Sequence, residues 1–482
     1  MVRGLPGSLC LALALLAGCA TTPPTRPLPA AQARCMQAYI DDDARLARAG
    51  IHDAQAMRVA GHPYLRVDRL LASFTDELHG RAQRAAWLAR ASALDSEGRA
   101  IEHARLPRRL DNTDAQMLAA CRDTLSQALL GDDAAWPALR TAAEVPDDYS
   151  TTRRALGLYA LSSRLVLQGV ARLQRREMPR PLDARAADAL VVERYQLGSA
   201  AQATVPKPSW THDALGIPEL DADLLAALLR QHAPALAIET AGDDDIPGHI
   251  HRRDPPYVHS AHTTLYTQLA HTRLGTQVLP QLVYTWWFTA RSAQGVIDPL
   301  AGKLDGLSWR VTLDSDGDVL AYDVVHNCGC YHMFFPTQRL QTRKHQADDA
   351  EPPWIPFTVP PAWQGRVRVV LEKGSHYVTA LAPAGDDATA RRYDLQPYAT
   401  LRNLTQGAER GSLFDHRGLV PGSTRGERWF LWPMGVVAPG SMRQWGHQAT
   451  AFVGRRHFDD ARLLERYFEL APATSAARSS AD

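Results

Sequence analysis

The chain has 482 residues, of which 45% are apolar and 22% are charged. Its length suits roughly two or three domains of about 150 residues each. The apolar share, which includes 11 Trp, is large enough to build a buried core and excludes a disordered polymer. The 53 Lys and Arg residues nearly balance the 52 Asp and Glu residues, so the chain lacks the basic excess that nucleic-acid binding requires.

Residues 1–18 have the pattern of a signal peptide. Arg3 precedes an apolar run, Leu9–Leu16, that is too short to span a bilayer core of roughly 30 Å. The run ends in Leu16-Ala17-Gly18-Cys19. This order of residues resembles the lipobox of bacterial lipoproteins, and the resemblance covers about the first twenty residues. It implies cleavage before Cys19 and acylation of the Cys19 thiol and of the new N-terminus.

The resemblance also predicts where the protein is held. Ala20 follows the cysteine, where enterobacterial lipoproteins retained at the inner membrane carry Asp, so Ala20 resembles an outer-membrane address. Residues 19–30 are rich in Pro and Thr and are expected to form an extended tether. No later run of apolar residues is long enough for a transmembrane span. We therefore expect a lipid-anchored protein on the periplasmic side of the outer membrane, with membrane lipid as its partner.

Residues 31–235 are expected to be mainly helical. Apolar residues between Val67 and Leu78 recur at the spacing of one helix face, and the leucines of Leu158–Leu173 continue this period. Asp221 has the position of a helix N-cap before a leucine-rich segment.

Residues 236–470 are expected to be rich in strands and to end in a helix over Asp459–Leu470. Apolar and polar residues alternate in several short segments, and an Asp-Gly turn lies at Asp314–Asp318. The predicted strands cover Leu282–Thr289, Trp309–Leu313, Val319–Val325, Val367–Leu371, Tyr377–Leu381 and Trp429–Trp432. Residues 471–482 are expected to be a disordered tail. The predicted class is α+β, with a helical N-terminal half followed by an antiparallel C-terminal half.

Cys35 and Cys121 are predicted to form a disulfide. Each lies on an apolar helix face, Cys35 with Tyr39 and Cys121 with Leu118 and Leu125. An even number of cysteines in an oxidising compartment favours such a bond.

The sharpest local motif has metal-capable side chains at every second position: His326, Cys328, Cys330 and His332. In a straight strand the outer two residues would lie about 20 Å apart, too far for one zinc ion unless the chain bends at Gly329. Three interpretations remain open. The two cysteines form a short-range, reducible disulfide, or the segment binds zinc, iron or copper, or it is a structural turn.

Two further histidine pairs are weaker metal candidates. His249 and His251 share one face of a strand if the segment is extended, and His259 and His262 follow closely. Neither pair is part of a complete metal-binding signature, so solvated loop histidines are the competing interpretation.

Aromatic residues are dense at Tyr284–Phe288 and at Trp429–Trp432. Such residues suit either a sheet core or a glycan-binding surface. Trp287, flanked by Thr285 and Thr289, is the candidate for an exposed position.

Two function classes follow from these motifs. The first is a binding or scaffold protein of the envelope with a protein or glycan partner. The second is a periplasmic metal-dependent or thiol-redox enzyme that uses the segment from His326 to His332.

Ser375 and His376 are adjacent, so on a strand they face opposite ways and cannot act as nucleophile and base for each other.

Overall fold

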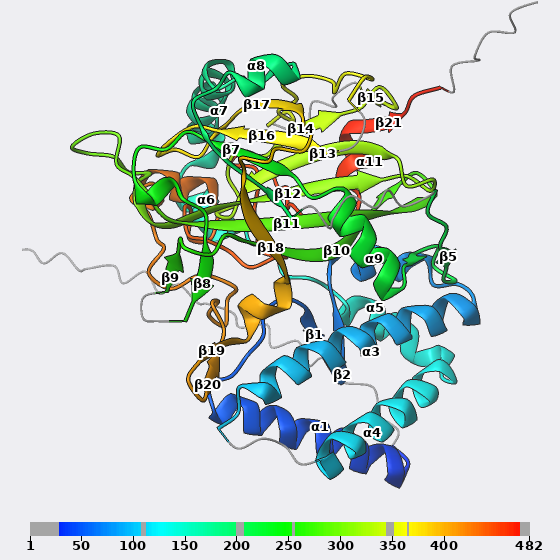
Figure 1. Ribbon diagram of the computed structural model, residues 1–482. Helices are drawn as coiled ribbons and strands as arrows, with labels where there is room; N and C mark the ends of the chain where they lie inside the picture. The colour runs from blue at the N-terminus through cyan, green and yellow to red at the C-terminus, as the bar shows by residue number, and fades with distance from the viewer. Residues whose placement is uncertain are drawn as a thin grey trace, which may run out of the picture.

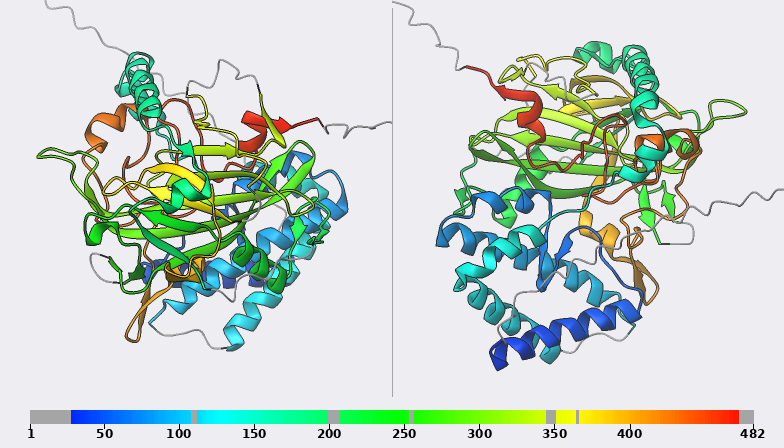
Figure 2. Two further views of the ribbon diagram at one scale, coloured as in Figure 1. Left: turned by 45° about the horizontal axis from the view of Figure 1, so that its top comes forward. Right: turned by 180° about the vertical axis from the view of Figure 1, so that it is seen from behind.

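The computed structural model describes residues 28–107, 112–198, 207–252, 256–343, 351–363 and 366–472 (Figure 1). The signal peptide, Cys19, most of the tether and most of the C-terminal tail lie outside the described residues. A group of helices near the N-terminus lies on one side of a large sheet, and both views of Figure 2 keep this arrangement.

The N-terminal helices enclose an apolar core of their own, which includes Tyr39, Trp87 and Leu125. A disulfide joins Cys35 to Cys121, with Cα atoms 5.0 Å apart, which confirms the predicted pair. The elements of this helical unit are α1 (Ala30–Arg48), β1 (Met57–Val59), β2 (His62–Val67), α2 (Arg69–Ala72), η1 (Thr75–Glu77), α3 (Arg81–Ala104), α4 (Asn112–Leu130), η2 (Asp133–Ala135) and α5 (Trp136–Ala142).

The predicted helix over Val67–Leu78 is wrong, because only α2 is α-helical there. Val67 ends strand β2, and the Asp68 carboxylate caps α2 by accepting the Leu71 N–H at 2.8 Å. The Ser73 hydroxyl then donates to the Leu70 carbonyl at 2.7 Å. Hydroxyl groups that bond to nearby backbone in this way compete with helix continuation.

Buried ion pairs connect the helical unit to the C-terminal half. Arg66 contacts Asp95 at 3.3 Å and Glu102 at 2.6 Å, and all three side chains are fully buried. Arg402, from the other half of the chain, donates from Nε to Asp53 at 2.9 Å. Because unpaired buried charges are costly, these contacts fix the two halves against each other.

The middle of the chain alternates short helices with strands. Asp221 caps α9, as predicted, by accepting the Leu224 N–H at 2.8 Å. The elements are α6 (Thr151–Leu156), α7 (Tyr159–Arg176), β3 (Arg180–Pro181), α8 (Ala184–Asp188), β4 (Glu193–Leu197), β5 (Thr211–His212), β6 (Pro218–Glu219), α9 (Ala222–Gln231), β7 (Ala235–Ile238), η4 (Asp243–Asp245), β8 (His249–His251) and β9 (Tyr257–His259).

The large sheet is mixed, so the expected antiparallel C-terminal half is wrong in this respect. Its strand order is β14-β13-β12-β11-β10-β18-β4-β7-β16-β17-β3, and the pairs β10–β18, β18–β4, β16–β7 and β17–β3 are parallel. Alternating side chains mark the two faces of a strand but not the direction of its neighbour. The remaining strands of this sheet are β10 (Thr264–Leu274), β11 (Gln277–Arg291), β12 (Gly302–Leu313), β13 (Val319–His326), β14 (Met333–Pro336), β16 (Val367–Leu371), β17 (Val378–Pro383) and β18 (Arg391–Pro397).

Strand β11 is buried on both faces, which explains its dense aromatic residues. Tyr284, Trp286 and Phe288 enter the main core on one face. Trp287 enters a second core on the other face and has no exposed surface, so its expected exposure is wrong. The backbone of Trp287 pairs with Gly306 of β12 and with Gly248, and its side chain packs in the second core with residues that include Ile250 and Tyr266.

The C-terminal segments wrap the sheet and correct two predictions. Trp429–Trp432 lies in helical turns instead of a strand, and Asp459–Leu470 contains only a short helix followed by a strand. The helical turns that begin in Trp429–Trp432 end shortly afterwards, at Pro433 and at Gly435, whose φ is +83°. These elements are β15 (Leu340–Thr342), η5 (Tyr398–Arg402), β19 (Leu404–Gln406), β20 (Glu409–Gly411), α10 (Arg428–Leu431), η6 (Trp432–Met434), α11 (Leu463–Tyr467) and β21 (Phe468–Leu470).

Candidate functional site

The segment from His326 to His332 forms a tight turn at the end of β13. The His326 N–H donates to the Cys330 carbonyl at 3.0 Å, and the Gly329 N–H donates to the His326 carbonyl at 2.7 Å. Gly329 has φ of +95°, and a Cβ there would lie 2.5 Å from the Ala449 carbonyl oxygen. The chain thus bends at Gly329, the residue identified from the sequence as the one that would permit a bend, and only glycine fits the position.

The turn sends the two histidines to opposite faces of the sheet. The His332 Nε2 lies 2.9 Å from Asp323, so His332 is on the same face of the sheet as Asp323. His326 follows Asp323 by three residues in β13, and its side chain therefore points to the opposite face. Among the described residues, no three His, Cys, Asp or Glu side chains converge on one point as they stand. The structure therefore does not bring the four motif residues around a single metal ion.

His326 instead belongs to a buried polar cluster around Asp305, which we call the Asp305 cluster. Its members are Asp245, Asp305, His326, His376 and Arg425, all at most 2% exposed. Asp305 contacts His376 Nδ1 at 2.8 Å, Arg425 Nη2 at 3.0 Å and His326 Nδ1 at 3.6 Å. On its other side His376 Nε2 lies 3.3 Å from Asp245.

The two imidazoles beside Asp305 titrate in opposite directions. Burial lowers the pKa of His326 to about 4, because its long contact with Asp305 compensates only in part. Burial opposes protonation of His376 too, but the carboxylates of Asp245 and Asp305, which accept hydrogen bonds from its ring, raise its pKa. Burial would also raise the pKa of Asp305, but Arg425 and the two histidines hold it well below the usual range. At neutral pH the cluster therefore contains an ionised Asp305 and a neutral His326, while the two carboxylates on either side of His376 favour its protonated form.

The backbone around the Asp305 cluster is strained. Leu304, Tyr331 and His376 have φ of +56°, +60° and +55°, in the left-handed region that non-glycine residues rarely adopt. Both ring nitrogens of His326 and the Nε of Arg425 are buried without a hydrogen-bond partner. Strain and unpaired polar atoms of this kind concentrate at functional sites and at places that hold ordered water.

Asp305 was not predicted as a site residue from the sequence, and His376 was considered only as a neighbour of Ser375. The cluster draws its members from β12, β13, η4 and two separate loops, so no local spacing indicates that they meet. The strained backbone and the unpaired atoms are visible only once the chain is folded.

Cys328 and Cys330 are free, buried thiols beside this cluster. A hydrogen bond from Cys330 and the nearby Arg425 lower the pKa of Cys328, whereas the bond to Cys328 and burial raise the pKa of Cys330. The pair is therefore polarised, with Cys328 as the sulfur that ionises first.

The four remaining candidate histidines lie together, and we call them the histidine quartet: His249, His251, His259 and His262. His249 and His259 are directly opposite each other in the β8–β9 ladder. Ring centres lie 5.1 Å apart for His249 and His251, 5.4 Å for His251 and His259, and 5.8 Å for His259 and His262. The structure thus joins the two predicted histidine pairs into one group.

A large apolar surface lies on α6, α7, α10 and η6. In α7 only Ser163 is buried, and Leu165 is 72% exposed. Trp429 on α10 is 71% exposed. The orange α10 lies beside α6 and α7 in Figures 1 and 2. We call this region the apolar–arginine surface; its exposed apolar residues are Leu156, Leu158, Leu161, Leu165, Trp429, Phe430 and Trp432.

The two halves of the apolar–arginine surface are packed against each other. A Cβ at Gly157 would lie 2.4 Å from the Pro433 side chain, so the connection between α6 and α7 touches η6 closely. Arg154 Nε donates to the Met434 carbonyl at 2.9 Å, and the Ser150 N–H donates to the Gly435 carbonyl at 2.7 Å. The exposed leucines and tryptophans are therefore held in a fixed arrangement.

A groove of about 680 Å³ opens on this surface. Trp429 and Trp432 line it together with Arg153, Arg417 and Arg428. The Arg428 guanidinium lies 4.7 Å from the Trp429 ring centre. The groove therefore combines aromatic rings with cationic groups, which suits an amphipathic ligand that carries negative charge.

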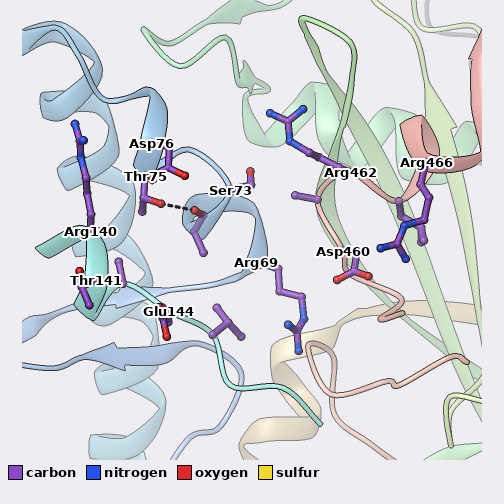
Figure 3. Close-up of a pocket in the computed structure, with 15 residues that line it drawn as sticks. Arg69, Ser73, Thr75, Asp76, Arg140, Thr141, Glu144, Asp460, Arg462 and Arg466 are labelled. Atoms are coloured by element: carbon purple, nitrogen blue, oxygen red, sulfur yellow. Dashed lines mark hydrogen bonds between the residues drawn. The ribbon is translucent and has the colours of Figure 1, made fainter. Parts of the chain in front are cut away.

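A cleft of about 670 Å³ lies between the helical unit and the C-terminal segment (Figure 3). Its cations are already paired with protein groups. Arg69 contacts Asp459 at 3.3 Å, and Arg462 contacts Glu77 at 2.8 Å and Glu465 at 2.6 Å. We therefore assign this cleft to the contact between the two halves of the protein.

Comparison of the chain with protein-family models, with curated proteins and with solved structures found no match. Among the described residues, no helix has the length and apolarity that crossing a bilayer requires.

Proposed function

We propose that the protein is a lipid-anchored binding protein of the bacterial envelope, whose apolar–arginine surface lies on a phospholipid membrane. The lipobox-like Leu16-Ala17-Gly18-Cys19 supports the anchor. The observation that carries the proposal is the exposure of large apolar side chains on one continuous surface, because contiguous apolar patches mark protein or membrane contacts.

The charge of the surface favours a lipid layer as its partner. The segment from Thr151 to Arg176 contains six arginines and no acidic residue. Arg153, Arg164, Arg172, Arg175 and Arg176 are all exposed. An exposed helix with leucines and arginines, flanked by Trp429 and Trp432, has the composition of a segment that lies in a membrane interface. Anionic headgroups would pair with the arginines while the leucines and tryptophans enter the acyl boundary.

The lipid contact is tested with the full chain carrying Cys19→Ser, which cannot be acylated at that residue. We expect this protein to sediment with vesicles that contain phosphatidylglycerol and to bind phosphatidylcholine vesicles more weakly, with a loss of binding at high salt. Binding should also shift tryptophan fluorescence to shorter wavelength, because Trp429 and Trp432 leave water.

The variant Leu161→Glu/Leu165→Glu should abolish vesicle binding without loss of stability, because both side chains are exposed. Ile40→Glu/Met117→Glu is the matched control, since it places the same charges at exposed apolar positions of α1 and α4. A wild-type surface that binds neither vesicle type would contradict the lipid contact. The anchor is tested separately, by labelling with a fatty-acid precursor that wild type should incorporate and Cys19→Ser should not.

A second function, thiol redox chemistry, is favoured by the polarised pair of Cys328 and Cys330. Oxidation would release two protons and two electrons and form one Sγ–Sγ bond, with a disulfide of an envelope protein or small thiol as the acceptor. Thiols are counted by mass spectrometry after equilibration with glutathione buffers of graded redox state. Reversible loss of both thiols would support this function, whereas thiols that stay reduced in oxidised glutathione would contradict it. The disulfide between Cys35 and Cys121 serves as the internal reference.

A further inference from the structure

The histidine quartet gathers four imidazoles on one exposed hairpin. His249, His251 and His259 share one face of the β8–β9 ladder, because His251 follows His249 by two residues and His259 pairs with His249. His262 stacks on His259 from the following turn. Tyr257, opposite His251, stacks on that ring at 5.4 Å.

The three spacings between consecutive rings of the quartet are close to those of ligands around one ion. Two imidazoles bound to a tetrahedral zinc ion at about 2.0–2.1 Å have ring centres roughly 5 Å apart. Consecutive ring centres of the quartet are separated by 5.1, 5.4 and 5.8 Å. Because the ring nitrogens do not yet converge, binding requires rotation of the rings, which is open to His251 and His262 because both are exposed.

Two further observations prepare the quartet for a cation. The Nδ1 of His249 lies 3.2 Å from the Tyr266 hydroxyl and 3.3 Å from the Thr264 hydroxyl. Either oxygen can accept the Nδ1 proton and leave the Nε2 lone pair for a metal, as in metal sites whose ligands are oriented by a second layer of hydrogen bonds. The Nδ1 of His259 is buried without a hydrogen-bond partner.

We propose that His249, His251, His259 and His262 bind a divalent transition-metal ion of the zinc and copper class. Imidazole nitrogens suit these ions, whereas calcium and magnesium prefer oxygen ligands. The site differs from both functions proposed above and uses none of their residues. His249 and His251 also line a cavity of about 580 Å³, so an ion held here would lie beside a space that admits a further ligand.

The test is calorimetric titration of the full chain with Zn²⁺ and with Cu²⁺. We expect one ion to bind per chain, with Mg²⁺ and Ca²⁺ giving no heat of binding. The variant His251→Ala/His259→Ala should weaken binding at least tenfold. The variant His79→Ala/His212→Ala removes two other exposed histidines and should bind as wild type does. Far-UV circular dichroism checks that each variant is folded.

X-ray absorption of the zinc-loaded protein then identifies the ligands. Nitrogen neighbours at about 2.0–2.1 Å are expected, whereas sulfur at about 2.3 Å would assign the ion to Cys328 and Cys330 and overturn the proposal. No binding of either ion, or equal affinity in the His251→Ala/His259→Ala variant and wild type, would also overturn it.

Discussion

The Asp305 cluster and the histidine quartet use the same side chain in opposite ways. In the Asp305 cluster the imidazoles are buried and shared among carboxylates, with His376 between Asp245 and Asp305. In the quartet the imidazoles lie beside one another at a hairpin near the surface, and His249 contacts hydroxyl groups and other rings. In the first arrangement carboxylates lie beside both nitrogens of His376, whereas in the second hydroxyl groups orient the ring of His249.

The difference shows that partners, more than spacing, decide what a histidine motif can do. His326 and His332 belong to the sharper motif, yet each turns to a buried carboxylate, Asp305 or Asp323. His332 contacts Asp323, which also pairs with Arg310, and His326 lies 3.6 Å from Asp305 on the other face of the sheet, so the two rings do not share one ion. His249 and His251 belong to the weaker motif but reach the arrangement that a metal requires.

The largest effect is expected at the centre of the buried cluster. Asp305→Asn removes the charge that lies between His376 and Arg425 and leaves the buried Arg425 guanidinium without its ion-pair partner. The free energy of unfolding should fall by roughly 3–5 kcal/mol. Urea denaturation measures this change, and Asp316→Asn in the exposed β12–β13 turn is the control. Equal stability of the Asp305→Asn variant and wild type would show that solvent screens the cluster.

The next largest effect is the contribution of His326 to the pH dependence of stability. The pKa of His326 in the folded protein is about 4, below the value of about 6.5 expected in the unfolded chain. Its contribution to stability is therefore complete above about pH 6.5 and is lost as the pH falls toward 4, by about 3 kcal/mol in total. His326→Asn should remove this part of the acid dependence in urea denaturation.

The exposed His79 provides the control for this slope, because His79→Asn should leave the pH dependence unchanged. Other buried histidines add to the slope of wild type, among them His232, whose pKa burial lowers to about 4. The comparison therefore rests on the difference between variants. Parallel curves for His326→Asn and wild type would contradict the assignment of a neutral, buried ring.

Local patterns in the sequence predicted the local elements of the fold. Alternation identified β11 and β16, the Asp-Gly turn identified the β12–β13 hairpin, and helix faces identified the disulfide between Cys35 and Cys121. The mixed sheet was not predictable in this way. Strand β18 lies between β10 and β4, which are far from it in the chain, and its alternation is compatible with parallel and antiparallel neighbours.

The candidate sites show the same limit. All four members of the histidine quartet were found because they lie within fourteen residues of one another, from His249 to His262. Asp305 joins His376 only through the pairing of distant strands and a loop in which His376 takes a left-handed backbone. The exposure of Leu161 and Leu165 was also not predictable from the sequence. Apolar residues at helical spacing usually indicate a buried helix face, but no other element in the described part of the chain covers these two leucines.

The smallest effect tests whether the quartet is built for a cation. Tyr266→Phe removes one hydroxyl, which accepts the Ile250 N–H at 3.0 Å and lies 3.2 Å from the Nδ1 of His249. Stability should fall by about 1 kcal/mol, and zinc affinity should fall about tenfold because His249 loses the group that orients its ring. Tyr39→Phe removes a comparable buried hydroxyl, which donates to the Leu118 carbonyl at 2.9 Å inside the helical unit. It should cost similar stability and leave zinc affinity unchanged. If both variants lowered zinc affinity equally, the effect of Tyr266 would reflect general loosening of the fold, and the contrast between a prepared metal site and a self-contained charge cluster would fail.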